Sequence, residues 1–343
     1  MKNLIILLLC LNGLTAALLP SCRPREPRHD GEVSVLVFIT GVLAGSPTFE
    51  MLASGALQFA EEHENVTVRI YEAGFNQALW EEQLLSMVAE GGYDLVLGSN
   101  PALPEIAASV GRNFPSQRFI IFDAQYSGNA QISTFLYNQY EQALFLGYLA
   151  GLLTTGDMPL ANASKRIGFI AAQEFPILNR HMLAGFLDGA RMADPDIELD
   201  FRVIGNWFDA AKAAELAASM LGAGVDVFTS VAGNAAQGML RAIEGRAYAL
   251  SFNINEYSRA PGVIIGCGSM EQKRLVRETL AAFLDGAVEF GGSGTVGVQD
   301  GYISFIFDDP GFRDHVPAGI QERFAAFMDD MRAGRMEYTV PPL

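Results

Sequence analysis

Aromatic, amide and acidic side chains recur directly after the apolar runs of this 343-residue sequence. Such side chains suit a flat, uncharged molecule, because aromatic faces stack on π-systems and amides both donate and accept hydrogen bonds. The segments after the runs hold no lysine or arginine, which a strongly anionic ligand would need. The candidate contact residues are Ser46, Phe49, Asn100, Asp123, Tyr140, Trp207, Phe208, Gly233, Asn234, Asn253 and Asn255.

Several of these residues also have a purely structural interpretation. Phe49 begins an apolar helical pattern and could belong to the core. Trp207 and Phe208 are adjacent, so we expect one ring to face the core and the other the ligand, and we favour Trp207 for the ligand. Asp209 precedes a helical pattern and is expected to be an N-cap. Asp123 follows an apolar strand, where a carboxylate needs hydrogen bonds, and this favours a contact role.

Sequence signatures of catalysis are missing: the chain contains no GxSxG, GxxxxGK[ST] or HExxH motif, and no GxGxxG between a strand and a helix. Arg180 and Lys273, the basic side chains nearest to the candidate loops, fall on predicted helices and are expected to be solvated. The four histidines lie away from the predicted strand ends: His29, His63, His181 and His315. We therefore expect a binding protein and not an enzyme, with neither a metal nor a cofactor.

Alternating β-branched and amphipathic segments predict parallel sheets covered by helices, an α/β fold. The first half predicts helices between its strands, which lie at Ser34–Thr40, Val66–Tyr71, Asp94–Leu97 and Arg118–Phe122. After a long helix at Tyr140–Leu153 the alternation resumes, with strands at Arg166–Ala171, Leu199–Ile204, Val225–Ser230 and Tyr248–Phe252. Two comparable series indicate two doubly wound lobes.

The last third of the chain is too short to form a third lobe. Its predicted strands, at Val263–Gly266, Val296–Val298 and Tyr302–Phe307, are expected to complete the two sheets, so that three crossovers form a hinge. The predicted limits are 33–127 with 257–290 for the N-terminal lobe, and 128–256 with 291–343 for the C-terminal lobe. A ligand would lie between the carboxyl ends of the two sets of strands.

The chain is acidic, with 23 Lys+Arg against 39 Asp+Glu and a formal charge of −16. A surface of that sign repels phosphate backbones, so we expect no nucleic-acid partner. Cys10, Cys22 and Cys267 are too few for a disulfide framework and have no metal-ligand spacing. Cys267 is expected to be a small core residue.

The N-terminus has the pattern of an export signal, with Lys2 before an apolar run that continues to Leu19. Leu19-Pro20-Ser21-Cys22 is similar to a bacterial lipobox, although proline is unusual within it. Residues 1–21 are thus predicted to be a signal peptide, Cys22 the lipidated residue and 22–32 a polar tether.

Five short stretches follow one another in an order and spacing that match a known family. They are Thr48-Phe49-Glu50, Glu141 with Leu144 to Gly151, Arg166 to Ile170, Ala184-Gly185-Phe186 through Gly189-Ala190, and Ala232-Gly233 with Gly238. Together with the lipobox, they resemble the basic-membrane-protein family of ABC-transporter substrate-binding lipoproteins, best known for purine nucleoside receptors. The resemblance covers about Val33 to Phe307 and implies a type I periplasmic-binding fold.

The departures from the family pattern remove charge. By resemblance, the acids with which nucleoside receptors hold their ligand fall at Gly45, Ser46, Asn253 and Asn255, and a lysine falls near Met270. Because the acids and the lysine are lost together, neither is left as a costly unpaired charge. Asp123, in contrast, matches a family acid.

A neutral set with aromatic rings suits a flat ligand that is larger than a purine and carries a polyol and an imide edge. Riboflavin fits that description, and the chain resembles the riboflavin-binding members of this family in spirochaetes. Phe49 and Trp207 are expected to sandwich the ring, Asp123, Asn100 and Asn234 to bond its edge or polyol, and Asn253 and Asn255 to close from the hinge side.

The resemblance implies a monomeric receptor, lipid-anchored and facing the periplasm, which delivers riboflavin to an ABC permease of the inner membrane. Two alternatives stay open. The ligand could be a purine nucleoside, or the chain could be a surface or sensory lipoprotein without a role in transport.

Overall fold

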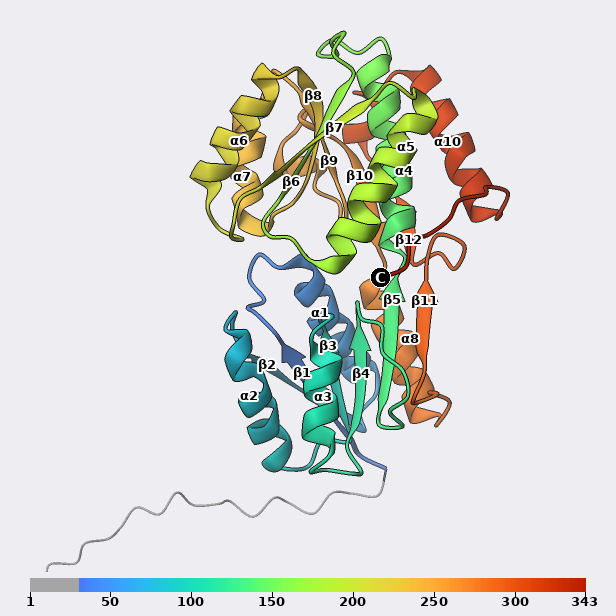
Figure 1. The fold of residues 1–343 in the computed structure, drawn as a ribbon. Helices are drawn as coiled ribbons and strands as arrows, with labels where there is room; N and C mark the ends of the chain where they lie inside the picture. Colours follow the sequence, from blue (N-terminus) through green and yellow to red (C-terminus); the bar gives the residue numbers. More distant parts are fainter. Residues whose placement is uncertain (1–30) are drawn as a thin grey trace, which may run out of the picture. The chain divides into compact units, whose positions relative to one another are not determined.

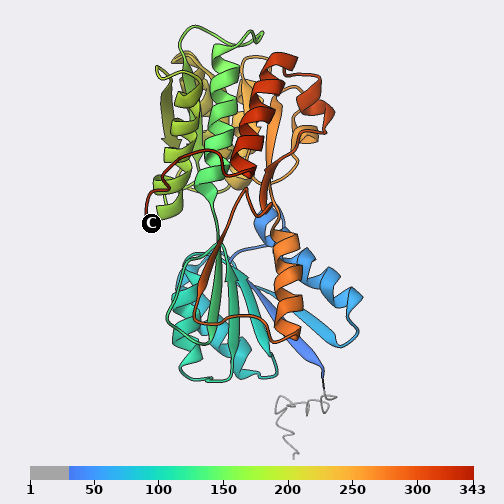
Figure 2. The same cartoon turned by 90° about the vertical axis from the view of Figure 1, so that its right-hand side faces the viewer.

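The computed structural model describes residues 31–343. The predicted signal peptide, Cys22 and most of the tether lie outside the described residues. Residues 33–343 form one compact unit with two six-stranded sheets (Figures 1 and 2). In the described part of the chain, no helix combines the length and the apolar character needed to cross a bilayer.

The first sheet is fully parallel and has the spatial order β11-β5-β4-β3-β1-β2. Its strands are β1 (Val33–Ile39), β2 (Val66–Glu72), β3 (Leu95–Ser99), β4 (Arg118–Phe122), β5 (Ile132–Tyr137) and β11 (Ser293–Val296). The sequence of each strand fits its position. The interior strand β1 is apolar on both faces, whereas the edge strand β2 alternates polar and apolar residues.

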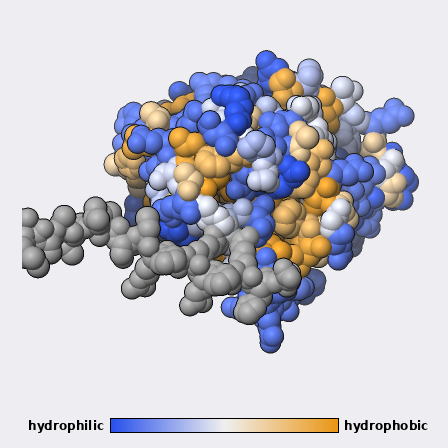
Figure 3. All heavy atoms as spheres, turned by 90° about the horizontal axis from the view of Figure 1, so that it is seen from below, coloured by the Kyte–Doolittle hydropathy of each residue, from blue (hydrophilic) through white to orange (hydrophobic). Residues whose placement is uncertain are grey.

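Helices cover both faces of the first sheet. One face of β1 packs with α1 (Pro47–Glu62) and α8 (Gln272–Leu284), through Leu52 and Val276 among others. The other face packs with α2 (Gln77–Ala89) and α3 (Leu103–Gly111), through Trp80 and Ala107 among others. Figure 3 views this lobe from below and shows apolar patches interrupted by hydrophilic residues.

The second sheet has the order β12-β10-β9-β8-β6-β7, with only β12 antiparallel. Its strands are β6 (Arg166–Ala171), β7 (Glu198–Val203), β8 (Val225–Val231), β9 (Tyr248–Ser251), β10 (Ile264–Met270) and β12 (Ile303–Phe305). In Figure 1, α6 (Ala210–Gly222) and α7 (Ala236–Ile243) lie on one side of this sheet. On the other side lie α4 (Gln139–Thr155), α5 (Leu183–Ala193) and α10 (Ala318–Arg332). Shorter helical segments are Leu178–Met182, a π-helix, Gly233–Ala235, Tyr257–Arg259 and α9 (Pro310–Arg313).

Glycines set the contact between α4 and α5. A Cβ atom on Gly147 would lie 2.0 Å from the Phe186 carbonyl oxygen, and one on Gly189 would lie 1.9 Å from the Leu144 carbonyl oxygen. Real Cβ atoms do not approach backbone that closely, so the two helices touch through their main chains. The glycines that carried the family resemblance are therefore needed for packing.

The chain crosses between the sheets three times, as predicted: from β5 to α4, from β10 to α8, and from β11 to β12. The structure corrects the predicted lobe limits, which ended the first part of the N-terminal lobe at 127 and began its second part at 257 and the last part of the C-terminal lobe at 291. Both β5 and β11 belong to the first sheet, and β10 belongs to the second. The strand β5 itself was not predicted. The crossings therefore lie just after Tyr137, Met270 and Val296.

Candidate functional site

The loops at the carboxyl ends of the two sheets meet across the lobes. These ends share one edge in a parallel sheet, and open α/β sheets bind ligands at that edge. A Cβ atom on Gly45, in the loop after β1, would lie 2.8 Å from Oδ1 of Asn234, which follows β8. Gly45 has a φ of +75°, so both its conformation and this close approach favour glycine. The two predicted edges are thus held next to each other.

Two aromatic rings flank the loop after β1. A Cβ atom on Gly41 would lie 2.8 Å from Cε2 of Phe49 and 3.0 Å from Cε1 of Phe75. Phe49 is half-buried at the start of α1 and contacts the core, whereas the side chain of Phe75 is 61% exposed. The sequence analysis did not include Phe75. It follows β2 directly, so the rule that selected the other strand-end loops would have found it.

Trp207 lies where three loops of the second lobe meet. Its indole Nε1 donates to Oε1 of Gln173 after β6 at 3.3 Å, and a Cβ atom on Gly233 after β8 would lie 3.5 Å from its Cε3. The indole is half-buried. Phe208 is 75% exposed, whereas Trp207 packs partly against the core, so the expectation that Phe208 is the core-facing ring was wrong. The structure leaves Trp207 as the better-supported ring of this edge.

Asp123 follows β4 and is held by a residue from beyond the hinge. Nε2 of Gln139, the first residue of α4, donates to its Oδ1 at 2.7 Å. Asp123 has a φ of +53°, a left-handed conformation uncommon outside glycine. Burial raises the pKa of the Asp123 carboxyl to about 6, and the hydrogen bond from Gln139 opposes that rise. Sequence reasoning missed Gln139, because only the fold brings it to the carboxylate.

The other acids of the strand-end loops have local partners. Asp209 caps α6 by accepting from Lys212 N, which confirms its expected N-cap role. Glu256 pairs with Arg259 at 2.5 Å, and Glu174 accepts from the side chain of Asn179 at 3.1 Å. Of these three acids only Glu256 has a cationic partner, whereas the groups that bond to Asp209 and Glu174 are neutral amides.

Three predicted contact residues are engaged elsewhere. Asn100 uses Oδ1 to accept from Ala102 N at 2.8 Å, in the turn that leads into α3. Asn255 donates to Asp309 at 2.8 Å and accepts from the main chain next to it. The ring of Tyr140 is buried in the second lobe, and its hydroxyl donates to Asp188 at 2.8 Å. Each of these side chains thus has a partner within the chain, and the expected ligand roles stay predictions.

Ser46, Asn234 and Asn253 remain at the facing edges. Ser46 is the N-cap residue of α1 but makes no side-chain cap hydrogen bond. Asn253 accepts from Met270 N through its main chain at 3.0 Å, beside the second crossing. Within residues 31–343, the side chains of these three residues have no hydrogen-bond partner, so their polar atoms are available to a ligand.

Four buried side-chain oxygens at the first-lobe edge also lack a partner in the described part of the chain. They belong to Thr40, Ser99, Tyr137 and Gln272. Burial and the nearby charge of Asp123 raise the pKa of Tyr137 well above its usual range, so its hydroxyl stays protonated. Thr40 ends a predicted strand, but none of the four is among the predicted contacts.

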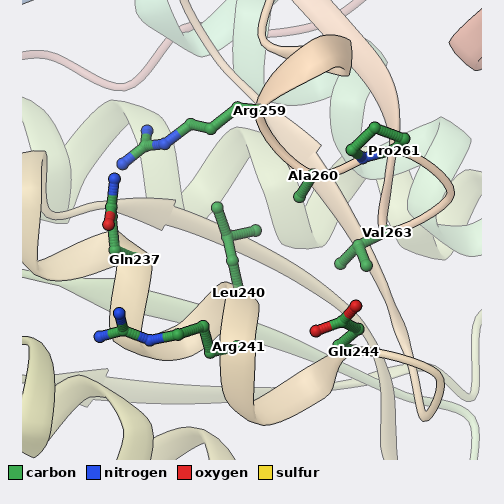
Figure 4. Close-up of a pocket in the computed structure, with 8 residues that line it drawn as sticks. All are labelled: Gln237, Leu240, Arg241, Glu244, Arg259, Ala260, Pro261 and Val263. Carbon is green, nitrogen blue, oxygen red and sulfur yellow. The ribbon is translucent and has the colours of Figure 1, made fainter.

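The described cavities lie outside this set of residues. A cavity of about 240 Å³ lies between α7 and the segment 259–263, where Figure 4 shows Leu240 between Arg259 and Arg241, and Val263 on the opposite side near Glu244. A second, also of about 240 Å³, lies at the hinge next to His181. None of the predicted ligand contacts lines either cavity.

Solved structures with this architecture include both solute-binding proteins and transcription regulators. A solute-binding protein of an ABC transporter system from Aeropyrum pernix K1 has a TM-score of 0.74 at 20% identity, over 91% of this chain and 94% of the other. A solute-binding protein from Conexibacter woesei has a TM-score of 0.67 at 17% identity, over 90% and 99%. The fold is therefore the type I periplasmic-binding fold.

The family described as "ABC transporter substrate-binding protein PnrA-like" matches residues 32–322, and the chain belongs to it. The ABC transporter nucleoside-binding protein BmpA of Lactococcus lactis is 29% identical over 165 residues, 48% of this chain. That match spans only 43% of the Lactococcus protein's length. Basic membrane protein A of Borreliella afzelii is 21% identical over 83% of this chain and 86% of its own length.

Proposed function

We propose that this protein is the substrate-binding lipoprotein of an ABC importer and that its ligand is riboflavin. The observation that carries the proposal is the pair of half-buried rings, Phe49 and Trp207, one on each facing edge. A flat ring system between them would gain about 1 kcal/mol from aromatic contact with each ring beyond area burial. The ligand is bound and released unchanged.

The polar atoms around the rings favour an uncharged ligand with several hydroxyls. Asn234, Asn253 and Ser46 offer donors and acceptors, and Arg259, the basic side chain of the connection between β9 and β10, is paired with Glu256. Asp123 can accept a hydrogen bond from an imide N–H or a hydroxyl through its second oxygen. Because Arg259 is paired with Glu256, these loops of the described chain leave no unpaired lysine or arginine for a phosphate, and this argues against a phosphorylated flavin.

A purine nucleoside is the second candidate. The name of the Lactococcus relative supports it, as does Asp123, which resembles a family acid. The same rings and amides could hold a purine and its ribose. The two ligands differ in ring size and in colour, and both differences can be measured.

The ligand that co-purifies with the full-length lipoprotein decides between these candidates. We expect a yellow preparation, whose extracted ligand has the mass of riboflavin, and quenching of flavin fluorescence on titration. Extraction of a nucleoside, together with undetectable binding of riboflavin, would replace the flavin proposal by its alternative. A protein that binds neither would favour a surface or sensory role.

Truncation of the rings tests the sandwich. Phe49→Ala and Trp207→Ala are each expected to weaken riboflavin binding by about 1–3 kcal/mol, because each loses one stacked face. Leu57→Ala is the matched control: Leu57 lies on the same helix as Phe49, is 42% exposed and is not a candidate contact, so its truncation should leave affinity nearly unchanged. Isothermal titration calorimetry measures the riboflavin affinity of all three variants. Equal affinities for the wild type and the two sandwich variants would rule out stacking.

We further propose that the protein is exported, lipid-anchored through Cys22 and active as a monomer beside its permease in the inner membrane. The lipobox similarity at residues 19–22 supports the anchor. Metabolic labelling with a fatty acid is expected to mark the wild type and to fail in Cys22→Ala.

A further inference from the structure

The segment from Met336 to Leu343 returns from the second lobe to the hinge. It follows α10, which packs on α4 through stacked rings of Tyr148 and Phe327, 4.0 Å apart. Figures 1 and 2 both place its end where the two lobes adjoin. We call residues 336–343 the hinge strap.

A single carboxylate joins the strap to two of the three crossings. Glu141, buried in the first turn of α4, accepts from the Tyr338 hydroxyl at Oε1 over 2.5 Å. Its Oε2 accepts from Val298 N over 2.8 Å, in the connection between β11 and β12. The first crossing, the third crossing and the strap therefore share one anchor.

Two further bonds fix the distal part of the strap. Nε2 of His181 bonds to the Pro341 carbonyl at 2.8 Å, and a guanidinium nitrogen of Arg180 donates to the Pro342 carbonyl at 3.2 Å. A carbonyl can only accept, so Nε2 of His181 carries the proton. Arg180, which was expected to be a solvated cation near the ligand loops, is thus engaged by the strap.

The strap faces the first lobe across the hinge cavity. Val340 to Leu343 line this cavity together with Leu136 and Thr295 of the first sheet. Rotation of the lobes about the crossings changes this space, because the strap is bonded to the second lobe and those strands belong to the first. The strap therefore lies where it can limit the rotation.

We propose that the hinge strap, anchored by Glu141, His181 and Arg180, stabilises the arrangement in which the loops of Gly45 and Asn234 meet, and so raises ligand affinity without touching the ligand. A ligand that needs both edges binds more weakly when the competent arrangement is less populated. The affinity part of this inference rests on the proposed function. The restraint on the lobes does not depend on the proposed function.

The test uses the full-length lipoprotein with Tyr338→Phe, and with a second variant that ends at residue 338. Tyr93→Phe is the matched control, since it also loses a hydroxyl that is hydrogen-bonded, to Arg69 at 2.8 Å, but in the first lobe away from the crossings. Small-angle scattering and amide hydrogen exchange report lobe opening without ligand. Titration with riboflavin, or with the nucleoside that co-purifies, reports affinity.

We expect a larger radius of gyration and faster exchange at residues 137–139 and 296–303 in both strap variants, with ligand affinity at least about five-fold weaker and the control unchanged. Unchanged scattering and exchange in folded strap variants would overturn the restraint. Greater opening with no bound ligand in any protein, wild type included, would support the restraint and reject the proposed function. Greater opening with unchanged affinity would overturn the coupling between strap and site.

Discussion

Gly147→Ala is expected to destabilise the second lobe by about 3 kcal/mol or more, the upper range for forcing one extra carbon into a packed core. The added Cβ atom would lie 2.0 Å from the Phe186 carbonyl oxygen, an atom of the backbone that no rotamer change can move. This clash can be relieved only if α4 and α5 move apart, and that would also disrupt the close contact at Gly189. Urea unfolding followed by circular dichroism measures the loss.

Gly319→Ala is the matched control for this prediction. Gly319 also lies in a helix, α10, but no atom lies within 4 Å of the position of its Cβ. Alanine there should be neutral or should stabilise the protein by up to about 1 kcal/mol, because glycine costs more backbone entropy. Equal stability of the two variants would show that α4 and α5 can separate at little cost.

The second large effect is expected at Asp123. Asp123→Asn should stabilise the ligand-free protein at pH 8 and, at the same time, greatly weaken ligand binding. The folded pKa of about 6 lies above the ordinary 3.8, so the ionised carboxylate opposes folding. At 1.36 kcal/mol per pKa unit this penalty is on the order of 3 kcal/mol, and the neutral amide removes it while it can still accept from Gln139.

The sign of the pH dependence follows from the raised pKa. Above pH 6 both folded and unfolded chains are ionised at Asp123, and the penalty is fully present. As the pH falls from 6 to 3.8 the folded state takes up the proton first, so the penalty fades. The stability gain of Asp123→Asn over the wild type should therefore be largest at pH 8 and small near pH 4.

Urea unfolding at both pH values checks this prediction. Asp157→Asn, at an exposed position, is the control and should show no such change. A gain of the same size at pH 8 and pH 4 would mean that the Asp123 carboxyl does not carry the penalty.

The alternation of apolar runs was sufficient to predict two α/β lobes and three crossings, but not β5. That strand contains Ser133 and Thr134, which weaken its apolar pattern although both are buried. The Thr134 hydroxyl donates to the Tyr126 carbonyl and accepts from Tyr126 N, so the preceding loop satisfies it. A pattern of residue types cannot show such compensation, and the missed strand displaced the first predicted lobe limit, at 127.

The site was predicted in part for a similar reason. Ligands of open α/β sheets bind where the strands end, and this rule predicted Phe49, Trp207 and Asp123 in segments that follow strands. The structure has all three in such segments. The rule could not show that Asn255 is bonded to Asp309, which is distant in sequence, or that Gln139 reaches Asp123 from the next lobe. Asn100 is different, because its bond to Ala102 N is local and asparagine commonly forms such turns.

The late position of β11 in the chain has a consequence for biogenesis. Ser293–Val296 completes the sheet that begins at Val33, and it is synthesised after nearly all strands of the other sheet. The first lobe therefore cannot reach its final strand order as a nascent N-terminal fragment, and pairing over so long a sequence separation slows folding. A polypeptide released early would expose the edge of β5 and would be prone to aggregation and proteolysis.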